Sequence, residues 1–115
     1  MIGSPQDHVD SVMLDELKEV MEDDFGILID TFLSDSEIRL VDVKTAYDEL
    51  NSKKLRESAH SLKGSCSNVG AAKLADICKH VEELGRVNKA EDAGQLIKDI
   101  LSEFEVVRVI LKEQV

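Results

Sequence analysis

The sequence predicts an all-α fold, an up-and-down antiparallel four-helix bundle with an additional short N-terminal helix. Apolar residues recur at helical spacing along successive segments that are joined by short polar connections, and no segment alternates as a strand would. The aromatic residues are one Tyr and three Phe, with no Trp, which favours an aliphatic helical core. The single proline is Pro5, so no proline ring interrupts a helix from residue 6 onward.

Residues 1–10 are polar and aperiodic, and we expect them to form a flexible lead before one domain that covers residues 11–115. A short helix is predicted over residues 11–22, where apolar residues recur before two aspartates interrupt. A long helix follows over residues 25–51. The expected seam of this second helix consists of Phe25, Leu28, Ile29, Phe32, Ser36, Leu40, Val43, Tyr47 and Leu50.

Ser52 is the expected N-cap of the third helix, because its hydroxyl can accept from the free amides of the first turn. Gly70 is expected to end that helix in the left-handed conformation. At about 100° per residue, one apolar stripe is predicted to face the core: Leu55, Ala59, Leu62, Cys66 and Val69.

A fourth helix is predicted over residues 71–84, with Gly85 closing it. The last helix is predicted over residues 92–113. Both have apolar stripes, made of Leu74, Ile77, Cys78, Val81 and Leu84 in the first and of Leu96, Ile97, Ile100, Phe104, Val107 and Leu111 in the second.

A second stripe of the third helix is polar and contains Arg56, His60, Lys63 and Ser67, rotated roughly 110° from the buried stripe. An exposed imidazole would therefore lie between two cations, one turn before it and one turn after. Gly64 lies in the interior of this helix, where glycine costs about 0.5 to 1 kcal/mol relative to alanine. We infer that the sequence keeps this glycine to leave room for an approaching partner.

Charge and composition exclude several classes of function. The net charge of −10 would repel a phosphate backbone, so we expect no nucleic-acid partner. No apolar run is long enough to span a membrane and no signal peptide is visible, so we expect a cytoplasmic monomer with no membrane partner. Cys66 and Cys78 lie on apolar stripes and are expected to be buried thiols. The dispersed His8, His60 and His80 do not indicate a metal site.

The third and fourth helices carry a motif that resembles the signature of histidine phosphotransfer (HPt) domains. The likeness extends from about residue 13 to the end of the chain, so the resemblance covers nearly all of it. The matching residues are His60-Ser61-Leu62-Lys63-Gly64-Ser65, Asn68, Gly70-Ala71, Leu74-Ala75 and Val81-Glu82-Glu83-Leu84-Gly85-Arg86.

This resemblance implies a phosphoryl carrier of a multistep two-component phosphorelay, without cofactor or metal. The polar start and the helix expected near the end of the sequence favour a free-standing protein, and a domain of a hybrid kinase is the alternative. His60 would accept the group from an aspartyl phosphate on one receiver domain and deliver it to another. The implied partners are receiver domains of response regulators and of hybrid sensor histidine kinases. Lys63 and Arg86 would stabilise the phosphoryl group, while Gly64 would give clearance for docking on a surface that includes Ser67 and Arg56.

Two other functions remain open from the sequence. A histidine kinase fragment also carries a phosphorylated histidine, but an acid usually follows it, whereas Ser61 follows here and no glycine-rich nucleotide-binding segment is present. In a purely structural helical adaptor, the pattern around His60 would be coincidence. His8 and His80 are interpreted as structural or incidental. Glu82 differs from those family members that carry an uncharged glutamine at this place, so we assign it no role.

Overall fold

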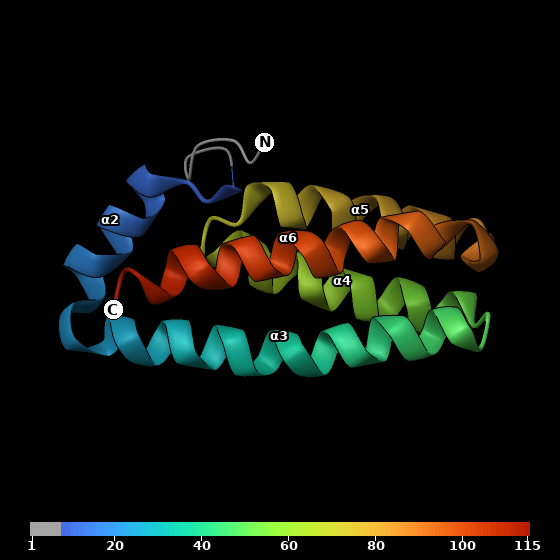
Figure 1. The fold of residues 1–115 in the computed structure, drawn as a ribbon, viewed down its shortest axis with the longest axis horizontal. Coiled ribbons are helices and arrows are strands. Elements are labelled where there is room, and N and C mark those ends of the chain that lie inside the picture. The colour runs from blue at the N-terminus through green and yellow to red at the C-terminus, as the bar shows by residue number, and fades with distance from the viewer. Residues whose placement is uncertain (1–7) are drawn as a thin grey trace.

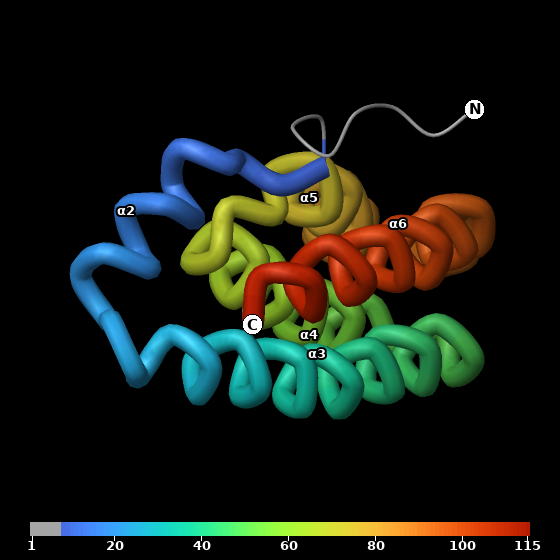
Figure 2. The backbone as a smooth tube through the Cα atoms, turned by 60° about the vertical axis from the view of Figure 1, so that its left-hand side comes forward, coloured from blue at the N-terminus to red at the C-terminus, as the bar shows by residue number. Residues whose placement is uncertain are grey.

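In the described part of the chain, the long helices run side by side and a shorter one crosses one end of them (Figures 1 and 2). The computed structural model describes residues 8–115, and within this range it contains no strand. The elements are α2 (Ser11–Met21), the 3-10 turn η1 (Glu22–Asp24), α3 (Phe25–Asp48), α4 (Ser52–Asn68), α5 (Ala72–Arg86), the 3-10 turn η2 (Ala90–Ala93) and α6 (Gly94–Lys112). The predicted four-helix bundle with an extra N-terminal helix is confirmed.

Residues 8–10 belong to the packed part of the chain, although the sequence placed them in the flexible lead. His8 and Val9 are 3% and 2% exposed. The Nδ1 atom of His8 lies 2.7 Å from Oε2 of Glu103 on α6, which is itself buried. The packed part of the chain therefore includes residues before the expected boundary at residue 11, because a buried carboxylate on α6 binds the Nδ1 atom of the buried His8. Residues 1–7 of the expected lead lie outside the described residues.

The start of α4 is fixed by Asn51, whose side-chain oxygen accepts from the amide of Lys54 at 3.0 Å. The predicted cap at Ser52 is therefore wrong by one residue, since Ser52 is already helical. The reason is that α3 ends at Asp48, earlier than expected, and this leaves Asn51 free to act as the cap. Leu50 lies in this connection at φ +52° and is 60% exposed, so it is not part of the seam.

The turn from α4 to α5 is formed as the sequence predicts. Gly70 has φ +75°, and its carbonyl accepts from the amide of Asp10 at 2.9 Å. An added Cβ at Gly70 would come within 3.3 Å of the Asp10 side chain, so the left-handed geometry and the packing both favour glycine. This turn anchors the N-terminal segment.

The core is aliphatic and continuous across the helices. All five residues of the predicted α4 stripe are completely buried, and so are Leu74, Cys78 and Val81 on α5. The cysteines are free thiols, as predicted. A hydrogen bond with Cys78, together with burial, raises the pKa of the Cys66 thiol far above its ordinary range. Both thiols are buried, so neither is available as a surface nucleophile.

Gly85 brings α4 and α5 together, which differs from its predicted role as a helix terminator. It lies inside α5, and an added Cβ would meet the backbone nitrogen of Arg56 at 2.7 Å and the carbonyl oxygen of Ser52 at 2.8 Å. Backbone atoms cannot yield as a flexible side chain can, so glycine permits the close approach of these helices. This contact sets the face of α5 against the polar stripe of α4.

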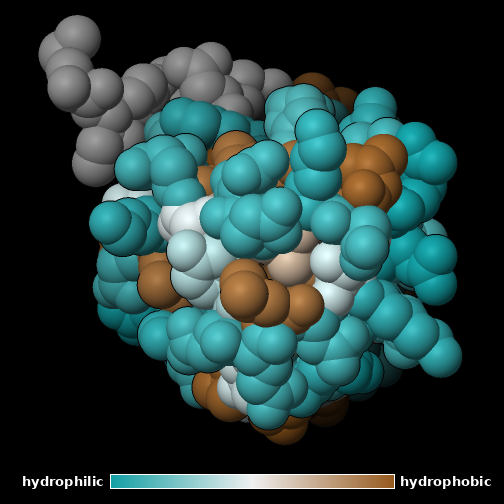
Figure 3. Space-filling model, turned by 90° about the vertical axis from the view of Figure 1, so that its right-hand side faces the viewer, coloured by the Kyte–Doolittle hydropathy of each residue, from teal (hydrophilic) through white to brown (hydrophobic). Residues whose placement is uncertain are grey.

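The end of the bundle that holds the α3–α4 connection has a largely hydrophilic surface with separate hydrophobic spots (Figure 3). Two exposed large hydrophobic residues lie in the connections at this end, Leu50 and Val87. Isolated apolar residues of this kind are ordinary on a protein surface. None of the described helices combines the length and the hydropathy needed to cross a membrane.

Candidate functional site

His60 projects from the middle of α4 toward solvent, with 67% of its side chain exposed. Ala59 and Leu62 lie next to His60 in sequence but belong to the buried stripe. Both are completely buried and hold this part of the helix against the core. His60 borders a shallow depression whose other lining residues are Arg56, Glu57, Ser61 and Glu82. The imidazole therefore extends from a well-packed helix and is accessible to a partner, as the sequence predicts.

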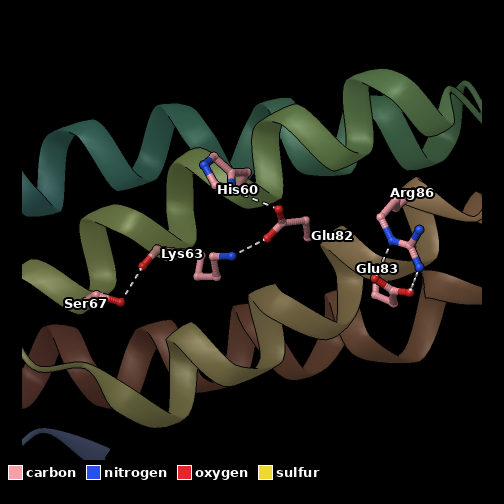
Figure 4. A network of polar contacts seen from close by, with 6 residues as sticks. All are labelled: His60, Lys63, Ser67, Glu82, Glu83 and Arg86. Atoms are coloured by element: carbon pink, nitrogen blue, oxygen red, sulfur yellow. Dashed lines mark hydrogen bonds and ion pairs between the residues drawn. The ribbon is translucent and has the colours of Figure 1, made fainter.

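Glu82 connects the two residues that the sequence singled out most clearly. It extends from α5, with one carboxylate oxygen 2.9 Å from Nδ1 of His60 and the other 2.5 Å from Nζ of Lys63 (Figure 4). The side chains of Glu82 and Lys63 are only 23% and 30% exposed, whereas His60 lies at the outer edge of the group. We refer to His60, Lys63 and Glu82 together as the α4–α5 triad.

The carboxyl group of Glu82 is ionised at neutral pH. Burial opposes ionisation, but the hydrogen bonds from Lys63 and His60, together with the charges of these two residues, outweigh it and hold the pKa of Glu82 below its ordinary value. An ionised carboxylate only accepts hydrogen bonds. The triad thus places a fixed negative charge between an imidazole and an ammonium group.

The other predicted site residues are placed differently. Ser67 donates its hydroxyl to the carbonyl of Lys63 at 3.1 Å, so it is tied to its own helix on the same face. An added Cβ at Gly64 would meet nothing within 4 Å, so the surface beside His60 is open there. Arg56 lines the depression beside His60, and its backbone lies against Gly85.

Arg86 is not brought to His60. Its guanidinium binds Glu83, with Nε donating to the carboxylate at 2.8 Å and Nη2 donating to the other oxygen. Figure 4 shows this pair further along α5, separated from the triad. The hydrogen bonds and charge of Glu83 raise the pKa of Arg86. The arrangement gives Arg86 no contact with the imidazole.

The sequence did not assign a role to Glu82. Helical periodicity orders the residues around one helix, but it does not give the rotation of α5 against α4. The described residues contain no group of three or more His, Cys, Asp and Glu side chains arranged to hold a metal ion.

A family model described as the Hpt domain matches residues 27–109, which include α4, α5 and the whole triad. The chain belongs to the Hpt domain family. Its fold is very similar to the crystal structure of histidine-containing phosphotransfer protein B (HptB) from Pseudomonas aeruginosa PAO1. That match has a TM-score of 0.91 and 41% sequence identity, and it covers 97% of this chain and 96% of HptB.

A more distant relative of this Hpt domain is the phosphorelay intermediate protein YPD1 of Candida albicans. The two sequences are 30% identical over 80 residues, which make up 67% of this chain. The chain spans only 44% of the length of YPD1. The similarity to YPD1 therefore concerns the Hpt region and not the rest of that protein.

Proposed function

We propose that this Hpt domain is a phosphoryl carrier in a multistep two-component phosphorelay and that His60 is the phosphorylated residue. The observation that carries the proposal is the exposed imidazole of His60 on a helix whose opposite face is fully buried, in a chain of this family. A neutral imidazole nitrogen is a nucleophile near neutral pH, and exposure leaves it accessible to a partner.

The proposed reaction is a reversible exchange between a carboxylate and the imidazole. A ring nitrogen of His60 attacks the phosphorus of an aspartyl phosphate, the new N–P bond forms, and the P–O bond breaks with its electron pair returning to the aspartate. Delivery to a second receiver reverses these steps. The ammonium group of Lys63 is one turn from His60 and can leave Glu82 to stabilise the phosphoryl oxygens by charge-assisted hydrogen bonds.

The partners in this proposal are receiver domains of response regulators and of hybrid sensor histidine kinases. Gly64 and the surface that includes Arg56 and Ser67 would lie under the docked receiver. The protein would act as a cytoplasmic monomer, and it would carry the phosphoryl group without hydrolysing ATP. We propose that residues 8–115 are sufficient for this activity, since this range contains the whole described bundle and the buried His8 and Val9.

Phosphotransfer from receiver domains of the host tests the proposal. Each receiver is phosphorylated with a small-molecule phosphodonor and mixed with this protein, and acid-labile label on the protein is then measured. We expect wild type to be labelled and His60→Gln to be unlabelled. His80→Gln is the matched control, because His80 is also exposed and helical but pairs only loosely with Asp76 at 4.0 Å. Persistent labelling of His60→Gln would overturn the assignment, and labelling of wild type by ATP alone would favour a kinase.

A further inference from the structure

The outer side of α3 carries a second row of residues at helical spacing, which takes no part in the core. α3 lies at the edge of the bundle, with its inner side against α4 and α6 and no other described helix on its outer side (Figures 1 and 2). Its apolar members Ile27, Ile38 and Val41 are 64%, 60% and 64% exposed. We refer to this row as the α3 outer stripe, and it consists of Ile27, Thr31, Ser34, Ile38, Val41 and Thr45.

The α3 outer stripe points directly away from the core. Ile27, Ser34 and Val41 each lie two residues before a residue that is almost completely buried, namely Ile29, Ser36 and Val43. Two residues correspond to about 200° around a helix, so the two sets face opposite sides. Steps along the stripe alternate between four and three residues, which is the repeat of a helix that packs along a second helix. At 1.5 Å per residue the stripe is about 27 Å long, enough for a partner helix of about 18 residues.

Small side chains in the middle of the stripe leave room for a side chain of a partner. Thr31 and Ser34 lie in a shallow depression on this face, whose other lining residues are Asp30, Asp35 and Ile38. When two helices pack along each other, a large side chain of one inserts between four residues of the other. The depression is therefore suited to a leucine or isoleucine from a partner helix.

Acidic residues flank the stripe and determine the chemistry of the partner. Asp30 and Glu37 lie along one side of it, and Asp35 and Asp42 lie along the other. In all, α3 has five acids and two bases, which gives this helix a net charge of −3. We propose that the α3 outer stripe docks an amphipathic helix of a partner protein, whose apolar seam is flanked by Lys and Arg.

The ion pairs that these acids already form do not neutralise the surface. Lys112 approaches Asp30 at 3.5 Å, and Arg39 lies 3.8 Å from Asp35 and 4.0 Å from Asp42. All of these side chains are exposed, and exposed ion pairs contribute little to stability. The basic residues of a docked helix can therefore compete for the same carboxylates.

The charges also argue against a second copy of this chain as the occupant. In a parallel pair of α3 helices, Asp30 would face Asp35 of the other copy, and Glu37 would face Asp42. Either direction of pairing would bring together two helices of net charge −3, and like charges across an interface are unfavourable.

The stripe is separate from the proposed phosphotransfer site. It shares no residue with the depression beside His60, whose lining residues belong to α4 and α5. A helix bound on the outer side of α3 would leave the imidazole accessible. The inference therefore goes beyond the proposed function and does not depend on it.

Binding of a synthetic helix to the intact chain tests the proposal. The probe is a fluorescein-labelled peptide of about three heptads, with Leu at positions a and d and Lys or Arg at e and g. It is used at concentrations at which it does not self-associate. One control peptide has Glu at e and g, and another keeps the basic residues but has Gln at a and d. Fluorescence anisotropy should show saturable binding of the probe and at least about 10-fold weaker binding of each control.

A pair of apolar substitutions locates the binding on α3. Ile38→Gln/Val41→Gln should weaken binding of the probe at least about 10-fold, because the complex would cover both side chains. Leu101→Gln/Val109→Gln is the matched control, since these residues are exposed and apolar but lie on α6, and it should leave binding unchanged. Circular dichroism checks that each variant is folded.

A pair of charge substitutions tests the choice of a basic partner. Glu37→Gln/Asp42→Asn should weaken binding of the probe and reduce its dependence on salt concentration, because two carboxylates beside the stripe are removed. Asp76→Asn/Glu83→Gln removes two exposed acids of α5 and should have no such effect.

The outcomes that would overturn the inference are distinct. They are absence of probe binding to wild type, and equal binding to wild type and Ile38→Gln/Val41→Gln. A wild-type dimer in sedimentation that this double variant abolishes would also overturn it, because a second copy would then cover the stripe. The double variant should accept phosphoryl groups as wild type does, and a loss of transfer would assign the stripe to the receiver surface instead. Absence of labelling in wild type would overturn the proposed function and leave the binding result unaffected.

Discussion

Gly64→Ala should make the protein more stable and at the same time a poorer phosphotransfer partner. Gly64 lies in the interior of α4, four residues after His60, and an added Cβ would have nothing within 4 Å. The substitution therefore introduces no clash in the free protein. It removes the entropic cost of a glycine in a helix, and it places a methyl group on the surface that we assign to the docked receiver.

The gain in stability follows from helix propensity, which favours alanine over glycine by about 0.5 to 1 kcal/mol in a helix interior. Unfolding entropy is about 2.1 cal/mol/K per residue, so a chain of 115 residues should melt about 2 to 4 °C higher. Urea and thermal denaturation followed by circular dichroism would measure both quantities. A loss of stability would contradict the open space observed beside Gly64.

The loss of function follows from overpacking at the interface, which typically costs about 1 to 3 kcal/mol and so about 5- to 150-fold in affinity. The dissociation constant for an unphosphorylated receiver and the rate of transfer from a phosphorylated one would measure it. Gly26→Ala is the matched control, since Gly26 is also helical and its added Cβ would meet only Val115 at 4.0 Å. Unchanged binding and transfer in Gly64→Ala would refute the clearance role.

Three further predictions concern the packing and the charges of the fold. Gly85→Ala should destabilise the protein by about 1 to 3 kcal/mol in urea denaturation, because the new Cβ would clash with the backbone of α4; a neutral effect would contradict the close approach. His8→Ala should cost about 1.5 to 3 kcal/mol by the same assay, since it leaves the buried carboxylate of Glu103 without its hydrogen bond at 2.7 Å, and full stability would show that the N-terminal segment contributes nothing. The folded protein lowers the pKa of Glu82 below its ordinary value of 4.5, so the ionised carboxylate stabilises the fold above about pH 4.5, and this stabilisation is lost as the pH falls through the lowered pKa. Wild type and Glu82→Gln should therefore differ in stability by at most about 1 kcal/mol near neutral pH. Denaturation measured over a series of acidic pH values should show this difference vanish.

The fold class and the exposed histidine could be predicted because both depend on residues that are close in sequence. The spacing of Leu55, Ala59 and Leu62 marks the buried face of α4, and the same arithmetic turns His60 outward. Gly70 was recognisable for a local reason, since a helix end often needs a left-handed residue. The predicted end of α3 at residue 51 was wrong by three residues, because Leu50 adopts the left-handed conformation at φ +52° in the connection to α4.

Contacts between helices could not be predicted from the spacing of residues in the sequence. His8 and Glu103 are 95 residues apart in sequence, and nothing near either of them marks the pair. Gly85 resembled a helix terminator because a glycine that ends a helix and one that admits a neighbouring backbone look the same in sequence. Arg86 looked like a ligand for the phosphoryl group, but its position three residues after Glu83 lets it form a local ion pair.

The sequence by itself determined the helical bundle, the buried stripe of α4 and an exposed His60 followed by Lys63 on the same face. Only the tertiary structure decided that Glu82 lies between these two residues. The physical reason is that periodicity describes the directions of side chains around one axis, whereas the approach of α5 to α4 depends on packing at Gly85. That packing brings the carboxylate of Glu82 within hydrogen-bonding distance of both His60 and Lys63.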